Sequence, residues 1–224
     1  MTDLISMVGA GPTTLGIHLD IGVVTGSQWT AGLSDLAAIR AEWGGWIEAH
    51  VVDHATPLRQ SDASWMLSIA DQLIVGHEAL RGLGSQTSEW LRSGRVAVGV
   101  HDAGSIKAAA ALPSPCSVTV MTTALGHAGE GPTPQRISLA RRAACAMTGL
   151  LEADGCVSSA TVPALAAVGC DRFVVGTNAF RELGDLTQLV ARLEAKYRSG
   201  QRLRGRDSTE AAAPEALQVV NYMF

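Results

Sequence analysis

The chain has 224 residues, and its 17 lysines and arginines against 21 aspartates and glutamates give a formal net charge of −4. This mild acidity argues against a general nucleic-acid binder, which needs a basic surface. No apolar run approaches the roughly 20 residues that span a bilayer, and no basic region precedes an apolar stretch at the N-terminus. Since the four cysteines form no CxxC pair, we expect a globular cytoplasmic protein that binds neither nucleic acid nor membrane.

Short apolar runs alternate with helix-like stretches along the chain. Most of the runs are apolar throughout, which is typical of parallel strands that are buried on both faces. We expect strands at Ile17–Ile21, Ile47–Val52, Gln72–His77, Val96–Val100, Ser117–Thr122, Leu150–Ala153 and Arg172–Val175.

Helix signals lie between these strands. Some are capping residues, and one is an apolar stripe that runs from Leu186 to Tyr197 with helical spacing. Helices are predicted at Asp35–Trp43 after an N-cap at Ser34, at Ser85–Ser93, at Pro134–Met147 after Thr133, and at Thr161–Val168 after Ser158 or Ser159.

Seven successive strand-then-helix units predict a parallel sheet with right-handed crossovers. An open doubly wound sheet and a (β/α)8 TIM barrel both fit the pattern. The open sheet is disfavoured because no GxGxxG turn follows the first strand. In a barrel, functional residues collect at the C-terminal ends of the strands.

Histidines and carboxylates stand at those strand ends. His18 and Asp20 are two residues apart, so both point to the same face of their strand. His50 and Asp154 come at the ends of the second and sixth strands. Together they form a plausible set of ligands for one divalent metal ion, namely zinc, iron, manganese or cobalt. From spacing alone, hydrogen-bonded core residues remain an equal alternative.

Glycines follow the same strand ends. Gly155 follows the sixth strand, and Gly176 with Thr177 follows the seventh. Barrels often bind phosphate through backbone N–H groups in these two loops. Gly126 and Gly129 could add further amides, although ordinary tight turns would explain each glycine equally well.

These residues, in this order, resemble the ribulose-phosphate 3-epimerase family of TIM barrels. The resemblance spans about residues 1–200 and rests on IHLDI at Ile17–Ile21, AHVVD at Ala49–Asp53, VTVMTTALGHAGEG at Val118–Gly131 and the segment Leu151–Phe180.

The resemblance implies metal ligands at His18, Asp20, His50 and Asp154, with Asp20 and Asp154 also acting as the acid and base. It further implies a methionine, Met121, that caps the site. The expected reaction is inversion of carbon 3 of a keto-sugar phosphate through an enediolate. The substrate would be ribulose 5-phosphate, xylulose 5-phosphate or a related sugar, and the protein would be a homo-oligomer.

Two other functions remain open. A non-catalytic sugar-phosphate binder could retain the barrel. The loop at residues 124–130, whose sequence departs from that of the family, favours this alternative. A metal-independent decarboxylase or synthase would need a lysine near the strand ends, and Lys107 and Lys196 are poorly placed for that role. His77, at the end of the third strand, is a further candidate for the substrate pocket.

The N-terminal part is shorter than the resemblance requires. The family places a strand before its His-x-Asp strand, but here the 17 residues before His18 contain only a helix-like stretch at Thr2–Val8. We therefore expect one domain over residues 1–224, with a barrel at 1–200 and a linker at 201–216. Leu217–Met223, within the segment 217–224, would fill the place of the first strand, and Asn221 could then face the site. A disordered or dimer-swapped tail is the alternative.

Overall fold

The strands lie where the apolar runs predict them. The computed structural model describes residues 16–22, 32–52, 57–113, 116–123, 133–176, 186–203 and 221–222. The bounds of each predicted strand are correct to within one residue. The strands are β1 (Ile17–Ile21), β2 (Ile47–Val51), β3 (Gln72–Gly76), β4 (Val96–Val100), β5 (Ser117–Met121), β6 (Leu151–Asp154) and β7 (Arg172–Val174).

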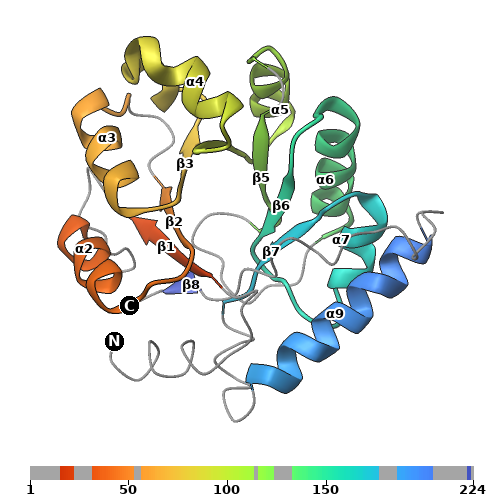
Figure 1. The fold of residues 1–224 in the computed structure, drawn as a ribbon. Coiled ribbons are helices and arrows are strands. Elements are labelled where there is room, and N and C mark those ends of the chain that lie inside the picture. The colour runs from red at the N-terminus through yellow and green to blue at the C-terminus, as the bar shows by residue number, and fades with distance from the viewer. Residues whose placement is uncertain are drawn as a thin grey trace.

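Helices follow the strands and form an outer layer around them (Figure 1). Two 3₁₀ helices, η1 (Ala79–Gly82) and η2 (Gly84–Gln86), lie between β3 and α4. The helices are α2 (Leu33–Glu42), α3 (Gln60–Ile69), α4 (Thr87–Arg92), α5 (Ala103–Ala110), α6 (Pro134–Ala146), α7 (Val162–Val168) and α9 (Leu186–Leu203). None of the helices in the described part of the chain is long and apolar enough to cross a membrane.

The predicted N-caps are correct in one case and wrong in two, and the predicted end of α7 at Gly169 is correct. Thr133 caps α6, as expected, because its hydroxyl accepts a hydrogen bond from the backbone N–H of Arg136. Ser34 lies inside α2, whose N-cap is Gly32, because the Asp35 carboxylate accepts from the Gly32 N–H at 2.7 Å. The N-cap of α7 is Thr161 rather than either serine. The helix expected at residues 2–8 falls outside the described residues.

The strands form one parallel sheet in the order β7-β6-β5-β4-β3-β2-β1-β8. The last of these, β8 (Asn221–Tyr222), comes from the other end of the chain and pairs in parallel with His18 and Leu19 of β1 (Figure 1). A C-terminal segment therefore extends the sheet beside β1, at the edge where the predicted segment 217–223 was expected. Within the described ranges this strand has two residues, and seven longer strands make up the rest of the sheet.

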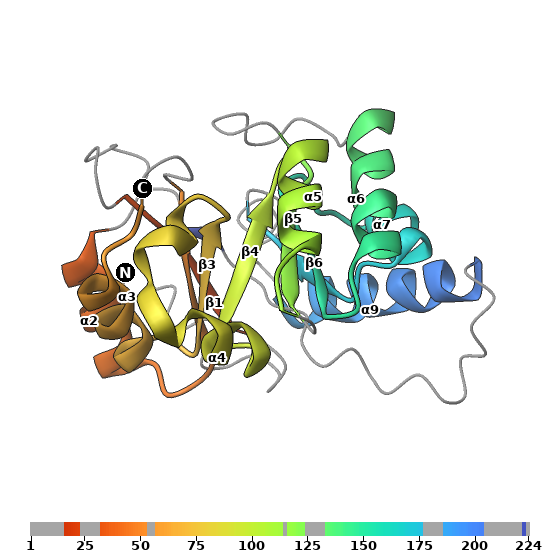
Figure 2. The same cartoon turned by 90° about the horizontal axis from the view of Figure 1, so that it is seen from above.

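The sheet is so strongly curved that strands far apart in the strand order face one another. Arg172 on β7 contacts Glu48 on β2 and Gln72 on β3, with N···O distances of 3.4 and 2.7 Å. No pairing between β7 and β8 occurs within the described ranges. The expected α/β class is correct at the level of a nearly closed, TIM-barrel-like parallel sheet surrounded by helices (Figures 1 and 2).

The two faces of the sheet differ in chemistry. Ile17, Leu19 and Ile21 point outward and belong to the hydrophobic core, together with Leu36 of α2. The alternate residues His18 and Asp20 point to the opposite face, because side chains alternate along a strand. The inner face of β1 is therefore polar, while its outer face belongs to the apolar core between the sheet and the helices. All four cysteines are free thiols: Cys116 and Cys170 are buried, Cys156 is partly buried and Cys145 is exposed.

Candidate metal centre

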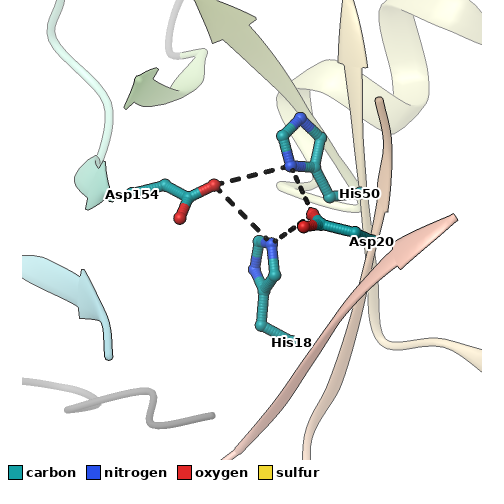
Figure 3. A group of neighbouring side chains, drawn as sticks. All are labelled: His18, Asp20, His50 and Asp154. Atoms are coloured by element: carbon teal, nitrogen blue, oxygen red, sulfur yellow. Dashed lines mark ion pairs between the residues drawn. The ribbon is translucent and has the colours of Figure 1, made fainter. Parts of the chain in front are cut away.

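Four side chains from three strands converge inside the curved sheet. Asp20 Oδ1 lies 3.5 Å from His18 Nε2 and 3.2 Å from His50 Nδ1. Asp154 Oδ2 approaches the same two nitrogens from the other side, at 3.8 Å and 3.5 Å respectively (Figure 3). The two histidines are fully buried, whereas the side chain of Asp20 is 15% exposed and that of Asp154 is 5% exposed. The structure thus brings together the four residues that the sequence identified.

Strand register explains this convergence. Asp20 on β1 and His50 on β2 are directly paired, so their side chains lie next to each other on the inner face. Asp154 ends β6 and pairs with Met121 of β5. Its backbone carbonyl accepts two hydrogen bonds from Thr122, from the N–H at 2.6 Å and from the hydroxyl at 2.9 Å. Asp154 is therefore fixed at the end of its strand, facing β1 and β2 across the interior.

The geometry fits a metal ion. Four ligand atoms that each lie about 2.1 Å from one ion, at the corners of a tetrahedron, are about 3.4 Å apart. The distances of 3.2 to 3.8 Å agree with this spacing. Among the described residues, His18 Nε2 and Asp20 Oδ1 are buried atoms without a hydrogen bond. Imidazole and carboxylate together suit zinc, iron, manganese and cobalt, so this group could hold a divalent ion.

Without a metal, protons bound to the two imidazoles would compensate the negative charge of the carboxylates. Burial alone would lower the pKa of His50, but Asp154 and Asp20 outweigh it and raise the pKa to about 9. Burial would also lower the pKa of His18, but Asp20 and Glu48 outweigh it and raise this pKa above its ordinary value. Burial would raise the pKa of Asp20, yet the two imidazoles hold it well below its usual range. The site thus attracts positive charge strongly.

Stability of the metal-free protein is therefore expected to fall as pH rises. The protonated His50 contributes stability that is fully present below its unfolded pKa of about 6.5 and is lost as pH rises through about 9. We expect the melting temperature of the metal-free protein to drop by roughly 5 °C between pH 6.5 and 9. Saturating metal should remove this drop, because the ion displaces the protons. Differential scanning fluorimetry measures both series, and a flat metal-free series would contradict the prediction.

A second polar group lies directly behind the four residues and was not assigned a role from sequence. Glu48, Glu152 and Arg172 are its charged members, joined by Gln72 and Thr119. Burial first, and the nearby Glu48 carboxylate second, raise the pKa of Glu152 to about 8. The sequence does carry a signal for them, since Glu48 and Glu152 stand two residues before His50 and Asp154. Charged residues on the inner face of otherwise apolar strands require buried partners.

The remaining predicted site residues lie at varied places. Met121 is buried at the end of β5, next to Asp154 in register. Asn221 is paired with His18 through the backbone. His77 is not part of the four-residue group, because its imidazole pairs with Glu78 at 3.0 Å. Gly126, Gly129 and Thr177 lie outside the described residues.

The two described glycines of the predicted phosphate site follow β6 and β7. Gly155 has a φ of +98°, and a Cβ at this position would collide with the side chain of Thr123. Glycine is therefore required for the turn itself. Gly176 comes two residues after the end of β7. Both glycines lie at the end of the sheet that carries Asp154, as a phosphate site beside the metal centre would require.

No family model matches the chain, and no curated protein matches it in sequence. Similarity is found among solved structures. A chain of the BexX/CysO complex from Amycolatopsis orientalis aligns over 94% of this chain and 88% of its own length, with 14% identity and a TM-score of 0.57. A designed cube-shaped cage, made by fusing symmetric oligomeric domains, aligns over 87% and 76%, with 14% identity and a TM-score of 0.53. At these identities, the likeness concerns the fold alone.

Proposed function

We propose that the protein is a metal-dependent epimerase that inverts carbon 3 of a keto-sugar phosphate. The observation that carries the proposal is the position of two carboxylates, Asp20 from β1 and Asp154 from β6, on opposite sides of a pair of buried imidazoles (Figure 3). The sequence resemblance to ribulose-phosphate 3-epimerases supports the same reaction. Ribulose 5-phosphate, xylulose 5-phosphate or a related keto-sugar phosphate is the expected substrate.

His18, Asp20, His50 and Asp154 would hold the ion through the four atoms that face one another. When bound, a divalent cation supplies positive charge beside the oxygen on which negative charge develops during proton removal. Only one oxygen of each carboxylate, Oδ1 of Asp20 and Oδ2 of Asp154, makes the contacts with the imidazoles described above. The other oxygen of each carboxylate is then available to accept or donate a proton.

Inversion next to a carbonyl requires a proton to leave one face of carbon 3 and another to arrive on the opposite face. Two carboxylates on opposite sides of the substrate perform these two steps. In one direction Asp20 removes the proton and Asp154 delivers one, and in the other direction the roles exchange. The partial exposure of the Asp20 side chain supports access for the substrate from this end of the sheet.

The glycine turns after β6 and β7 would bind the phosphate of the substrate through backbone N–H groups. Gly155 and Gly176 lie in the described part of these turns. Gly126, Gly129 and Thr177, which lie outside the described residues, are proposed to complete the phosphate site. Met121 and Asn221 are proposed to line the pocket.

The test is exchange of the carbon-3 hydrogen. The protein is loaded with zinc, iron, manganese or cobalt in turn and incubated with ribulose 5-phosphate or xylulose 5-phosphate in deuterium oxide. We expect deuterium at carbon 3 together with formation of the epimer, both detected by NMR. Metal and sugar-phosphate binding without exchange would favour the non-catalytic binder, and absence of metal with every cation would overturn the proposal.

We further propose that the sheet closes as a (β/α)8 barrel, with the C-terminal segment in the position of the first strand. The parallel pairing of Asn221–Tyr222 with His18 and Leu19 supports this closure. A variant that ends at Glu215 would expose the edge of β1, which favours aggregation. We expect its melting temperature to fall by about 5 °C or more. A variant that ends at Tyr222 retains β8 and is the control, and equal stability of all three proteins would contradict the closure.

A further inference from the structure

The guanidinium of Arg172 lies inside the curved sheet, behind the metal centre. Arg172 is 8% exposed at the start of β7, and its Nη1 donates to Gln72 Oε1 at 2.7 Å. Nη1 also lies 3.4 Å from Glu48 Oε1 and 3.9 Å from Glu152 Oε2. The indole of Trp46 stacks near the guanidinium, with a distance of 5.5 Å from Cζ to the ring centroid. One cation thus connects side chains from β2, β3 and β6.

Glu48 links this cation to a predicted metal ligand. Its Oε2 lies 2.8 Å from His18 Nδ1, and both residues are fully buried. A carboxylate only accepts hydrogen bonds, so the Nδ1 of His18 must be the donor. The other nitrogen, Nε2, then faces Asp20 and Asp154 and is available as a ligand atom. A carboxylate behind a histidine fixes the tautomer and orientation of the ring in many metal sites.

The position of the Glu48 carboxylate depends in turn on the residues behind it. Gln72 accepts from Arg172 through Oε1, and its Nε2 donates to the backbone carbonyl of Gly94 at 2.6 Å. The guanidinium is therefore anchored to the backbone through Gln72 while it faces the second oxygen of Glu48. A continuous series of contacts leads from a backbone carbonyl beside β4 to the imidazole of His18.

A second metal ion is the alternative occupant of this place. His18, Glu48 and Glu152 bring three possible ligand atoms within 4.8 Å of one another. However, the Arg172 guanidinium already supplies a positive charge 3.4 to 3.9 Å from both glutamates. A divalent ion added there would be repelled by that charge, so the group has a cation that belongs to the chain itself.

We propose that Arg172 is a positioning residue for the metal centre, acting through Glu48 to hold His18 in the orientation and tautomer that bind the ion. This inference rests on the metal site of the proposed function. Arg172 is not one of the four proposed ligands and acts through Glu48, so its removal should weaken metal binding itself and not only turnover. Partners of metal-binding residues typically change metal affinity by about 10–100-fold.

The test measures zinc affinity by chelator competition in the wild type and in Arg172→Met. We expect one zinc per chain in the wild type and an affinity about 10–100-fold lower in the variant. The d–d spectrum of the cobalt-loaded protein should also change, which a loss of stability alone would not cause. The matched control is Arg40→Met, because Arg40 bonds Asp71 and backbone carbonyls on the outer layer. It should keep the zinc affinity of the wild type.

A double-mutant cycle tests the route through Glu48. Glu48→Gln alone should weaken zinc binding about as much as Arg172→Met does. The double variant should bind zinc no more than about twofold more weakly than Glu48→Gln alone. Arg172→Lys, which retains the charge, should recover part of the affinity. Because removal of Arg172 leaves two facing glutamates, Arg172→Met with Glu152→Gln provides a variant in which Glu48 faces a neutral amide instead of a second carboxyl group. That variant should show the same loss.

The possible failures are distinct. A wild type without zinc would overturn the metal site itself. A wild type that binds one zinc while folded Arg172→Met binds it equally well would overturn only the role of Arg172. Fully additive losses in the double-mutant cycle would show that Arg172 does not act through Glu48. Two zinc ions per wild-type chain would contradict the view that the guanidinium occupies the second position.

Discussion

Replacing Asp154 with asparagine is expected to reduce epimerisation by about 10²- to 10⁴-fold, the usual contribution of a positioned acid or base. Asparagine keeps the size of the side chain and an oxygen that can face the imidazoles, but it cannot carry the proton. Because Asp20 still serves its own face of carbon 3, one epimer should continue to exchange its carbon-3 hydrogen while the other does not. Exchange in deuterium oxide, started from each epimer separately, measures this asymmetry.

Asp20→Asn should show the opposite preference between the two epimers. The control is Asp62→Asn on α3, since Asp62 pairs with Arg59 on the outer layer. It should exchange both epimers as the wild type does. Equal loss of exchange from both epimers in the two interior variants, with metal content unchanged, would contradict the division of labour between the two carboxylates.

Replacing His50 with alanine is expected to abolish metal binding at micromolar concentrations, with an affinity at least about 100-fold lower. The imidazole is fully buried, and its Nδ1 lies within 3.5 Å of both aspartates, so no solvent-exposed side chain can take its place. A ligand present at 100 times its dissociation constant stabilises a protein by about 2.7 kcal/mol. Zinc should therefore raise the melting temperature of the wild type by about 5–10 °C and leave that of the variant unchanged.

His77→Ala is the matched control for this experiment. His77 also follows a strand, but its imidazole is 30% exposed and pairs with Glu78 outside the group of four. It should bind zinc with the affinity of the wild type. Retention of zinc by a folded His50→Ala protein, or its loss in both variants, would contradict the assignment of the ligands.

The strands were predictable because their signal is local. A run such as Val96–Val100 is apolar throughout and buried throughout, so its position follows from composition alone. Helix starts were harder, because several polar residues often compete for one cap. At α2 the Asp35 carboxylate reaches back to the Gly32 N–H, and the helix begins before Ser34. The sequence predicts Ser34 as the cap, and only the backbone path shows that Gly32 takes this position.

The four candidate ligands were predictable because each is a polar residue in an otherwise largely apolar strand, and three of them, Asp20, His50 and Asp154, lie at or next to its C-terminal end. The roles of the residues behind them were not predictable, because these roles depend on which strands face each other after the sheet has curved. Arg172 contacts Glu48 across 124 positions of sequence and Gln72 across 100. No local pattern reveals such a contact. The carboxyl partner of His18 likewise appears only once β1 and β2 are in register.

The central claim is that His18, Asp20, His50 and Asp154 bind one divalent metal ion. Crystals grown with zinc, with diffraction data collected on both sides of the zinc absorption edge, test it most directly. The account predicts one anomalous peak per chain, about 2.0–2.2 Å from His18 Nε2, Asp20 Oδ1, His50 Nδ1 and Asp154 Oδ2. The absence of a peak among these four side chains, in crystals of the folded protein with excess zinc, would contradict it.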